Sequence, residues 1–124
     1  MSDVQTTHSG FAEISGARLY YEVAGQGHPF VLTHEGIADH RMYDDQFGVF
    51  SQRYQTIRYD LRGFGQSSVP TAPFSYGEDL YGLLRFLGVE RAHVLGMSMG
   101  GEASVDFTLS HPEMVSALVL AISG

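Results

Sequence analysis

The sequence predicts an α/β fold in which about six strands form a mostly parallel sheet, with helices on both faces, in three layers. The first observation is that the segments 30–33 and 117–122 are almost entirely apolar, as is typical of parallel strands buried on both faces. The second is that helical patterns separate such runs, as the crossover connections of a parallel sheet require. Together they predict one Rossmann-like half, formed by a single domain over residues 1–124.

Composition narrows the class of protein. Of the 124 residues, 44% are apolar and 17% are charged, which is typical of a globular domain, and there is no cysteine for a disulfide or thiolate site. The net charge of −7 disfavours nucleic acid and anionic membranes as partners, because both attract basic surfaces. Residues 1–10 are polar and are expected to be flexible. With no apolar run of membrane-spanning length, we expect a cytoplasmic protein.

The chain begins with a predicted β-hairpin. Alternating apolar and polar residues indicate strands at 11–15 and 18–24, and Gly16-Ala17 would form the turn. A loop rich in glycine follows, and then the buried strand at 30–33.

The next elements are a helix over 39–52 and a strand over 54–60. Tyr43, Phe47 and Phe50 recur at helical spacing and predict the apolar face of that helix. The strand is rich in β-branched and aromatic residues, and a glycine-containing loop follows it.

A second helix is predicted from its capping signals. Ser75 and Glu78 have the spacing of a capping box, and Gly88 would close the helix. Its apolar face comprises Leu80, Leu83, Leu84 and Leu87. A strand at 91–97 comes next.

The first candidate for chemistry is Ser98, in the sequence Gly96-Met97-Ser98-Met99-Gly100. A strand precedes this G-x-S-x-G motif and a helix ending near His111 follows it, which predicts a sharp turn that presents the serine as a nucleophile. The two glycines allow strand and helix to approach closely. The alternative is a structural serine bonded to its own helix.

The second candidate is the turn that follows the strand at 30–33. Parallel strands end on one edge of the sheet, so this turn and Ser98 should face the same crevice. One backbone N–H from the turn and that of Met99 would form an oxyanion hole. His34 is either a general base or a structural, hydrogen-bonded residue.

The glycines in the segment 60–67, DLRGFGQS, do not predict a nucleotide site. A third glycine is missing from the dinucleotide fingerprint, and no helix signal follows directly. We expect no metal site either, because the histidines lack ligand spacing; they stand at positions 8, 28, 34, 40, 93 and 111.

In this order, these segments resemble the N-terminal half of the α/β-hydrolase superfamily, from the starting hairpin to the sixth strand, including the nucleophile elbow. The segments that carry the resemblance are LTHEG at 32–36, YDLRGFGQSS at 59–68, SYGEDLYGLLRFLGVERAHVLGMSMGG at 75–101 and HPEMVSALVL at 111–120. The similar members are small cofactor-free esterases, enol-lactonases, C–C bond hydrolases and haloperoxidases. The resemblance therefore implies no cofactor.

The resemblance implies roles for individual residues. Ser98 matches the nucleophile, Met99 supplies one oxyanion N–H and Gly36 matches the other donor. Glu35 stands where the family's motif has a glycine, which leaves either Gly36 or Ile37 to face the hole.

The family's acid and histidine come later than the sixth strand, and the resemblance assigns no residue here to either role. We therefore expect weak hydrolysis of small activated esters through Ser98, completed by a partner chain or by an improvised base. Candidates for that base are His34 or His40, with Asp39 or Asp60. The alternative function is a non-catalytic, oligomerising half-domain.

The strand at 117–122 is expected to leave one sheet edge unpaired. A symmetric contact would cover two such edges at once, which predicts a homodimer or higher self-association.

Overall fold

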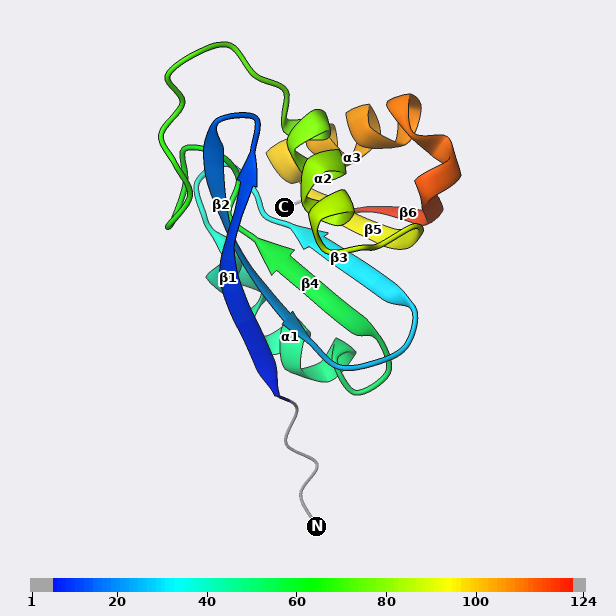
Figure 1. Cartoon of the computed structure of the whole chain (residues 1–124). Helices are drawn as coiled ribbons and strands as arrows, with labels where there is room; N and C mark the ends of the chain where they lie inside the picture. Colours follow the sequence, from blue (N-terminus) through cyan, green and yellow to red (C-terminus); the bar gives the residue numbers. More distant parts are fainter. Residues whose placement is uncertain (1–5, 122–124) are drawn as a thin grey trace.

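The computed structural model describes residues 6–121, which form a six-stranded sheet with helices on both faces (Figure 1). The predicted α/β class is confirmed. The strands are β1 (Thr7–Ile14), β2 (Ala17–Ala24), β3 (Pro29–Thr33), β4 (Gln55–Tyr59), β5 (Ala92–Met97) and β6 (Val115–Ala121). Their order across the sheet is β1-β2-β4-β3-β5-β6, in which β1 and β2 are antiparallel and the remaining four strands are parallel to one another.

Helical segments connect the parallel strands. They are η1 (His40–Tyr43), α1 (Asp44–Phe50), α2 (Tyr76–Phe86), α3 (Met99–Ser110) and η2 (Pro112–Met114). None of the helices among residues 6–121 has both the length and the apolarity that a bilayer crossing needs.

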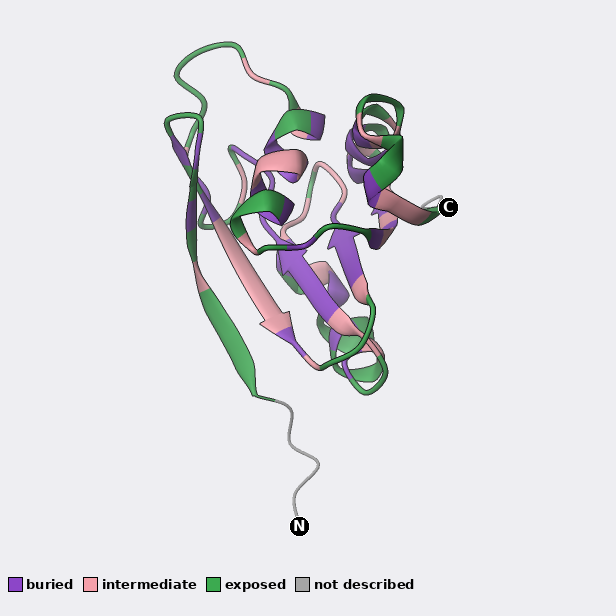
Figure 2. Ribbon diagram, turned by 45° about the vertical axis from the view of Figure 1, so that its right-hand side comes forward, coloured by how far each residue is buried: buried purple, intermediate pink, exposed green. Residues whose placement is uncertain are grey.

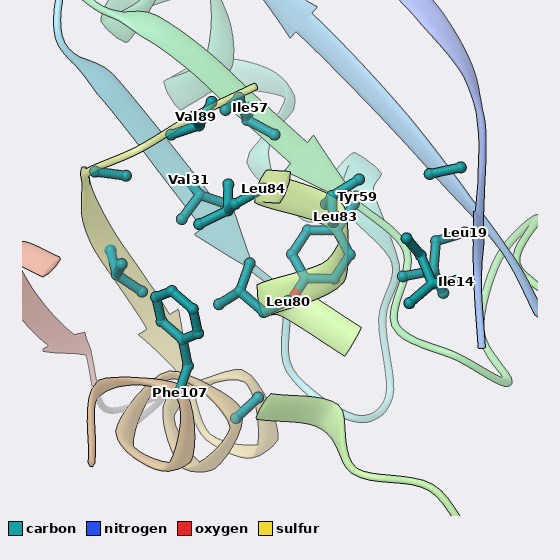
Figure 3. Packing of buried hydrophobic residues seen from close by; sticks show 14 of the residues in the cluster. Ile14, Leu19, Val31, Ile57, Tyr59, Leu80, Leu83, Leu84, Val89 and Phe107 are labelled. Carbon is teal, nitrogen blue, oxygen red and sulfur yellow. The ribbon is translucent and has the colours of Figure 1, made fainter. Parts of the chain in front are cut away.

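The central strand β3 is buried on both of its faces, which explains its apolar sequence. Phe30 and Leu32 pack in a cluster with Tyr43, on the face that η1 and α1 cover. Val31 points to the opposite face, into the larger core beneath α2 and α3 (Figure 3). Leu80, Leu83, Leu84 and Phe107 contribute to that core from the two helices. Because side chains alternate between the two faces of a strand, β3 contributes residues to the apolar cluster on each face of the sheet.

The hairpin forms as predicted, with a turn one residue earlier than expected. Ser15 and Gly16 both have positive φ, 48° and 82°, which is the pattern of a type I′ turn. The expectation of a flexible segment over residues 1–10 is wrong for its second half. Thr7 pairs with Ala24, and the pairing continues along β1, because backbone hydrogen bonds do not require apolar side chains. Residues 1–5 lie outside the described part of the chain.

The helix predicted over 39–52 is shorter and divided. Asp39 caps a 3₁₀ turn, accepting a hydrogen bond from the Arg41 N–H at 2.9 Å, and the α-helix then extends only from Asp44 to Phe50. The segment begins with a 3₁₀ turn in which the His40 N–H donates to the buried carboxylate of Asp60. Tyr43 and Phe47 are buried as expected.

The cap of α2 is confirmed, because Ser75 Oγ accepts a hydrogen bond from the Glu78 N–H at 3.2 Å. Gly88 follows the helix with a φ of 73°, a conformation that glycine adopts without strain. Burial falls toward both outer strands, and the first residues of β1 are exposed (Figure 2). On β6, the side chains of Leu118, Val119 and Leu120 are 37%, 45% and 51% exposed.

Candidate active site

Ser98 occupies a strained turn between β5 and the first residue of α3. Its φ of 56° and ψ of −117° lie outside the regions that most side chains adopt. Ser15 is the other described residue besides glycine with a positive φ. The Ser98 side chain is exposed, and among residues 6–121 no side chain forms a hydrogen bond with it. The turn thus presents a free hydroxyl at the amino end of a helix, where backbone N–H groups lack helical partners.

The glycines on either side of Ser98 are required by the packing. A Cβ on Gly96 would lie 2.5 Å from Ser104 Oγ and would collide with the Gly100 carbonyl oxygen. A Cβ on Gly100 would collide with the Thr33 carbonyl oxygen at the end of β3. At each of these two positions only glycine leaves enough room. The absence of side chains there lets α3 pack directly against β3 and β5.

The turn after β3 lies against the elbow. A Cβ on Gly36 would be 2.8 Å from Met99 Cε. The Ala38 N–H donates to the Glu35 carbonyl at 3.2 Å, which places Gly36 and Ile37 at the two central positions of the turn. Neither of their N–H groups has a hydrogen-bond partner among the described residues. A cavity of about 320 Å³ joins the two features and is lined by Glu35, Gly36, Ile37, Ser98 and Met99.

A second cavity, of about 530 Å³, also reaches Ser98. It is lined by Ser98, Gly101, Glu102, Val105, Asp106, Leu120 and Ala121, from α3 and β6. Ser98 therefore lines two cavities, one beside the turn after β3 and one between α3 and β6.

His34 is a structural residue, and its interpretation as a base is wrong. The side chain is fully buried. Its Nδ1 donates to the Glu35 carbonyl at 2.7 Å, and its Nε2 accepts from the Leu61 N–H at 2.9 Å. Both nitrogens are therefore occupied, and burial lowers the pKa of the imidazole, which keeps it neutral. His34 ties the turn after β3 to the loop after β4.

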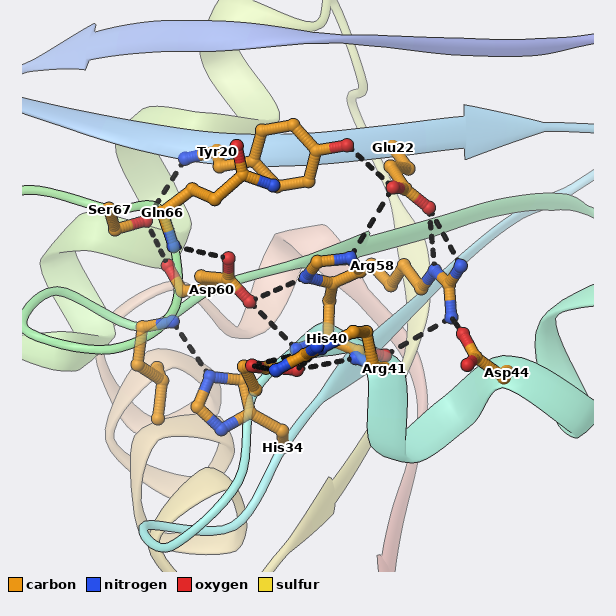
Figure 4. A network of polar contacts seen from close by, with 12 residues as sticks. Tyr20, Glu22, His34, His40, Arg41, Asp44, Arg58, Asp60, Gln66 and Ser67 are labelled. Carbon is orange, nitrogen blue, oxygen red and sulfur yellow. Dashed lines mark hydrogen bonds and ion pairs between the residues drawn. The ribbon is translucent and has the colours of Figure 1, made fainter.

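That second loop is organised around the buried carboxylate of Asp60 (Figure 4). Asp60 accepts hydrogen bonds from the His40 N–H at 2.7 Å, from His40 Nδ1 at 2.8 Å and from the Gln66 N–H at 2.9 Å. A Cβ on Gly65 would collide with this carboxylate, so the second glycine of DLRGFGQS makes room for the charge. The Gln66 N–H donates to the Asp60 carboxylate, and no helix begins between Asp60 and Tyr76.

Comparisons with known proteins agree with this geometry. The model of the α/β-hydrolase fold family matches residues 29–123. The chain belongs to the α/β-hydrolase fold family. A hydrolase from Pseudomonas aeruginosa is 36% identical, with a TM-score of 0.86 over 93% of this chain and 46% of its own. The enol-lactonase of Burkholderia xenovorans is 28% identical, with a TM-score of 0.80 over 88% of this chain and 45% of its own.

A relative in sequence is an uncharacterized protein of Mycobacterium tuberculosis, which is 32% identical over 98% of this chain and 37% of its own length. The chain thus spans less than half the length of the hydrolases and relatives that it matches here. The predicted family and the predicted extent of the match, its N-terminal half, are both confirmed.

In this hydrolase fold, the other proposed bases do not share a cavity with Ser98. His40 lies between two carboxylates, with Nδ1 2.8 Å from Asp60 Oδ1 and Nε2 3.4 Å from Glu22 Oε2. His40, Asp39 and Asp60 line a separate cavity of about 330 Å³. Hydrogen bonds from Arg41 lower the pKa of Asp39 to about 2, so this carboxylate is a poor proton acceptor. The improvised bases predicted from the sequence are therefore not brought to Ser98.

Four members of this polar network were not expected from the sequence: Tyr20, Glu22, Asp44 and Arg58. Arg58 bonds Glu22 Oε1 at 2.9 Å through Nε and Asp44 Oδ1 at 2.7 Å through Nη1, and the Tyr20 hydroxyl bonds Glu22 Oε2 at 2.5 Å (Figure 4). The local signal was a charged residue within each strand: Arg58 in β4 and Glu22 in β2. The pairing of β2 with β4 places those two opposite one another.

Proposed function

We propose that this chain is the nucleophile-bearing part of a serine hydrolase of the carboxylesterase type, acting on small activated esters. The observation that carries the proposal is the exposed Ser98 in its strained turn, beside unpaired N–H groups in the turn after β3 and at the first residue of α3. Hydrolases of several kinds are found among its relatives and structural neighbours, and the enol-lactonase is by name an enzyme that opens an ester bond.

In the proposed reaction, Ser98 Oγ forms a bond to the carbonyl carbon of the ester. The N–H of Met99 and that of Gly36 or Ile37 would donate to the oxygen as it becomes negative, which lowers the barrier to attack. The alcohol then leaves with a proton, and water hydrolyses the acyl-serine and restores the hydroxyl.

The proton of Ser98 needs an acceptor. Among the described residues no histidine bonds Ser98, so the proposal assigns this role to a residue outside residues 6–121, in the same polypeptide or in a partner chain. Without such a residue, an oxyanion hole and binding alone leave about 10³–10⁴-fold acceleration over water. This chain by itself is therefore expected to be a weak esterase.

One observation favours a second candidate function. Leu118, Val119 and Leu120 are exposed on the outer strand β6, with Leu118 and Leu120 on one face of the sheet and Val119 on the other, and this apolar surface suits an oligomerising half-domain without catalysis. Such a domain would retain the Ser98 turn for packing alone.

The experiment compares the chain with its Ser98→Ala variant. We expect hydrolysis of p-nitrophenyl acetate and butyrate to fall to the background rate in the variant, and a fluorophosphonate probe to label Ser98, as located by peptide mass spectrometry. Ser110→Ala is the matched control, because Ser110 is an exposed serine at the other end of α3. Equal rates in the chain and in Ser98→Ala, with no labelled Ser98, would leave the non-catalytic function.

A further inference from the structure

Three polar side chains meet at the end of the sheet opposite Ser98. His28 directly precedes β3, His93 is the second residue of β5, and Ser116 is the second residue of β6. His28 Nε2 lies 2.7 Å from Ser116 Oγ, and His93 Nδ1 lies 2.9 Å from the same oxygen. One hydroxyl therefore bridges two imidazoles.

The sheet register brings these residues together. Phe30 pairs with His93 across β3 and β5, which places His28 beside the start of β5. An irregularity between Ala92 and His93 shifts the pairing with β6, and Ser116 lies at that shift. Because these strands are far apart in the sequence, no local spacing of histidines reveals the cluster.

The two rings lie close together, and a nitrogen of each is directed at the same atom. Their centroids are 4.4 Å apart and their planes are inclined by 47°. Both nitrogens approach a single point, the position of Ser116 Oγ. Two imidazole nitrogens bound to one tetrahedral zinc ion are about 3.4 Å apart, so an ion at that point would draw both rings inward as the hydroxyl moves aside.

The surroundings fix one ring and leave the pair accessible. The rings of Phe30 and Tyr54 pack edge-on against His93, each at 5.8 Å between centroids, and hold the ring in place. His28 and Ser116 are accessible enough for an ion to enter, because His28 is exposed and Ser116 is half-buried.

We propose that His28 Nε2 and His93 Nδ1 form a two-imidazole binding site for a divalent transition-metal ion such as Zn²⁺, separate from the Ser98 site. Water completes the coordination, and the Ser116 hydroxyl rotates aside or acts as a weak further ligand. Imidazole nitrogen suits zinc, nickel and copper, with Cu²⁺ binding more tightly than Zn²⁺, whereas Mg²⁺ prefers oxygen.

The test is a calorimetric titration of the full chain, without a polyhistidine tag, with ZnCl₂ at fixed neutral pH. One ion should bind per chain, and His28→Gln and His93→Gln should each weaken binding by about tenfold or more, because one of two protein ligands is lost. Circular dichroism checks that the variants are folded, and His28, being exposed, keeps the test valid if His93→Gln unfolds. MgCl₂ should give no binding.

His111→Gln is the matched control, since His111 also stacks on an aromatic ring and bonds another side chain, Glu78, but has no second imidazole beside it. It should leave zinc binding unchanged. Ser116→Ala should retain binding, because both imidazoles remain. Absence of zinc binding, an affinity of His28→Gln and of a folded His93→Gln equal to that of the unsubstituted chain, or a tenfold loss in Ser116→Ala would each overturn the proposal.

Discussion

Ser98 and His34 follow the carboxyl ends of neighbouring parallel strands, yet their side chains have opposite surroundings. Ser98 is exposed and its hydroxyl has no partner among the described residues, while His34 is fully buried and both of its nitrogens are bonded. A residue without partners is available to react, and a residue with all of its partners satisfied stabilises its neighbours. The position of a side chain in the fold, more than its type, separates these two roles.

His34 gives a prediction for the pH dependence of stability. Burial lowers the pKa of its imidazole in the folded state, so the unfolded chain takes up this proton first. The contribution of His34 is therefore complete above about pH 6.5, the ordinary value, and is lost as the pH falls below it, by up to about 1.4 kcal/mol per pH unit. Urea unfolding of the chain and of His34→Gln at pH 7.5, 6.5 and 5.5 would measure it.

The other titrating groups are the same in the chain and in His34→Gln, so their effects cancel when the two free energies of unfolding are subtracted. The stability difference between the chain and His34→Gln should therefore shrink between pH 6.5 and 5.5. A difference independent of pH would contradict a neutral, buried His34.

At the scale of an element, the loop between β4 and α2 is held by one buried ion pair. Arg62 donates to both carboxylate oxygens of Asp79, at 3.0 Å through Nε and 2.6 Å through Nη2, and both side chains are less than a tenth exposed. Burial raises the pKa of Asp79 even though Arg62 opposes that effect. The guanidinium also bonds the Ile14 carbonyl and stacks over Phe74. The pair thus joins the hairpin, the loop and α2.

We expect Arg62→Met to lower the free energy of unfolding by about 3–5 kcal/mol at neutral pH, because Asp79 would remain buried without its partner. Adding Asp79→Leu should recover part of that loss, because apolar packing can replace a buried ion pair. Urea unfolding of both variants checks this. A loss below about 1 kcal/mol in Arg62→Met would show that water solvates Asp79, and so would contradict the buried pair.

At the scale of the whole molecule, the sheet has a different chemistry at each end and at each edge. Its carboxyl end carries Ser98 and the turn at Gly36, and its amino end carries His28, His93 and Ser116. The β6 edge has no further strand among residues 6–121, and its apolar side chains are exposed. Unpaired backbone groups together with exposed apolar surface favour pairing with another chain.

We therefore propose that this chain self-associates through β6 as a symmetric dimer. Val119→Lys should shift the molar mass to that of a monomer in size-exclusion chromatography with light scattering, because a charged edge strand disfavours pairing. Leu109→Lys is the control, because Leu109 is an exposed apolar residue on α3 and should leave the dimer intact. A monomeric wild-type chain at every concentration would exclude this contact.

Local sequence determined the elements of this protein and the shape of its elbow. The Ser75 cap, the glycine that ends α2 and the glycines around Ser98 act within a few residues, where sterics and backbone hydrogen bonding decide the conformation. For the same reason, the strands were predictable from short apolar runs, and the alternation with helices predicted the sheet.

Only the tertiary structure decided what the histidines do. His34 is not available as a base, because its Nε2 accepts a hydrogen bond from the Leu61 N–H on another loop. His40 bonds Asp60, and His28 meets His93, through strands that the sheet places side by side. Sequence spacing carries no information about such contacts, because an imidazole acquires its function from partners that only the folded chain brings within hydrogen-bond distance.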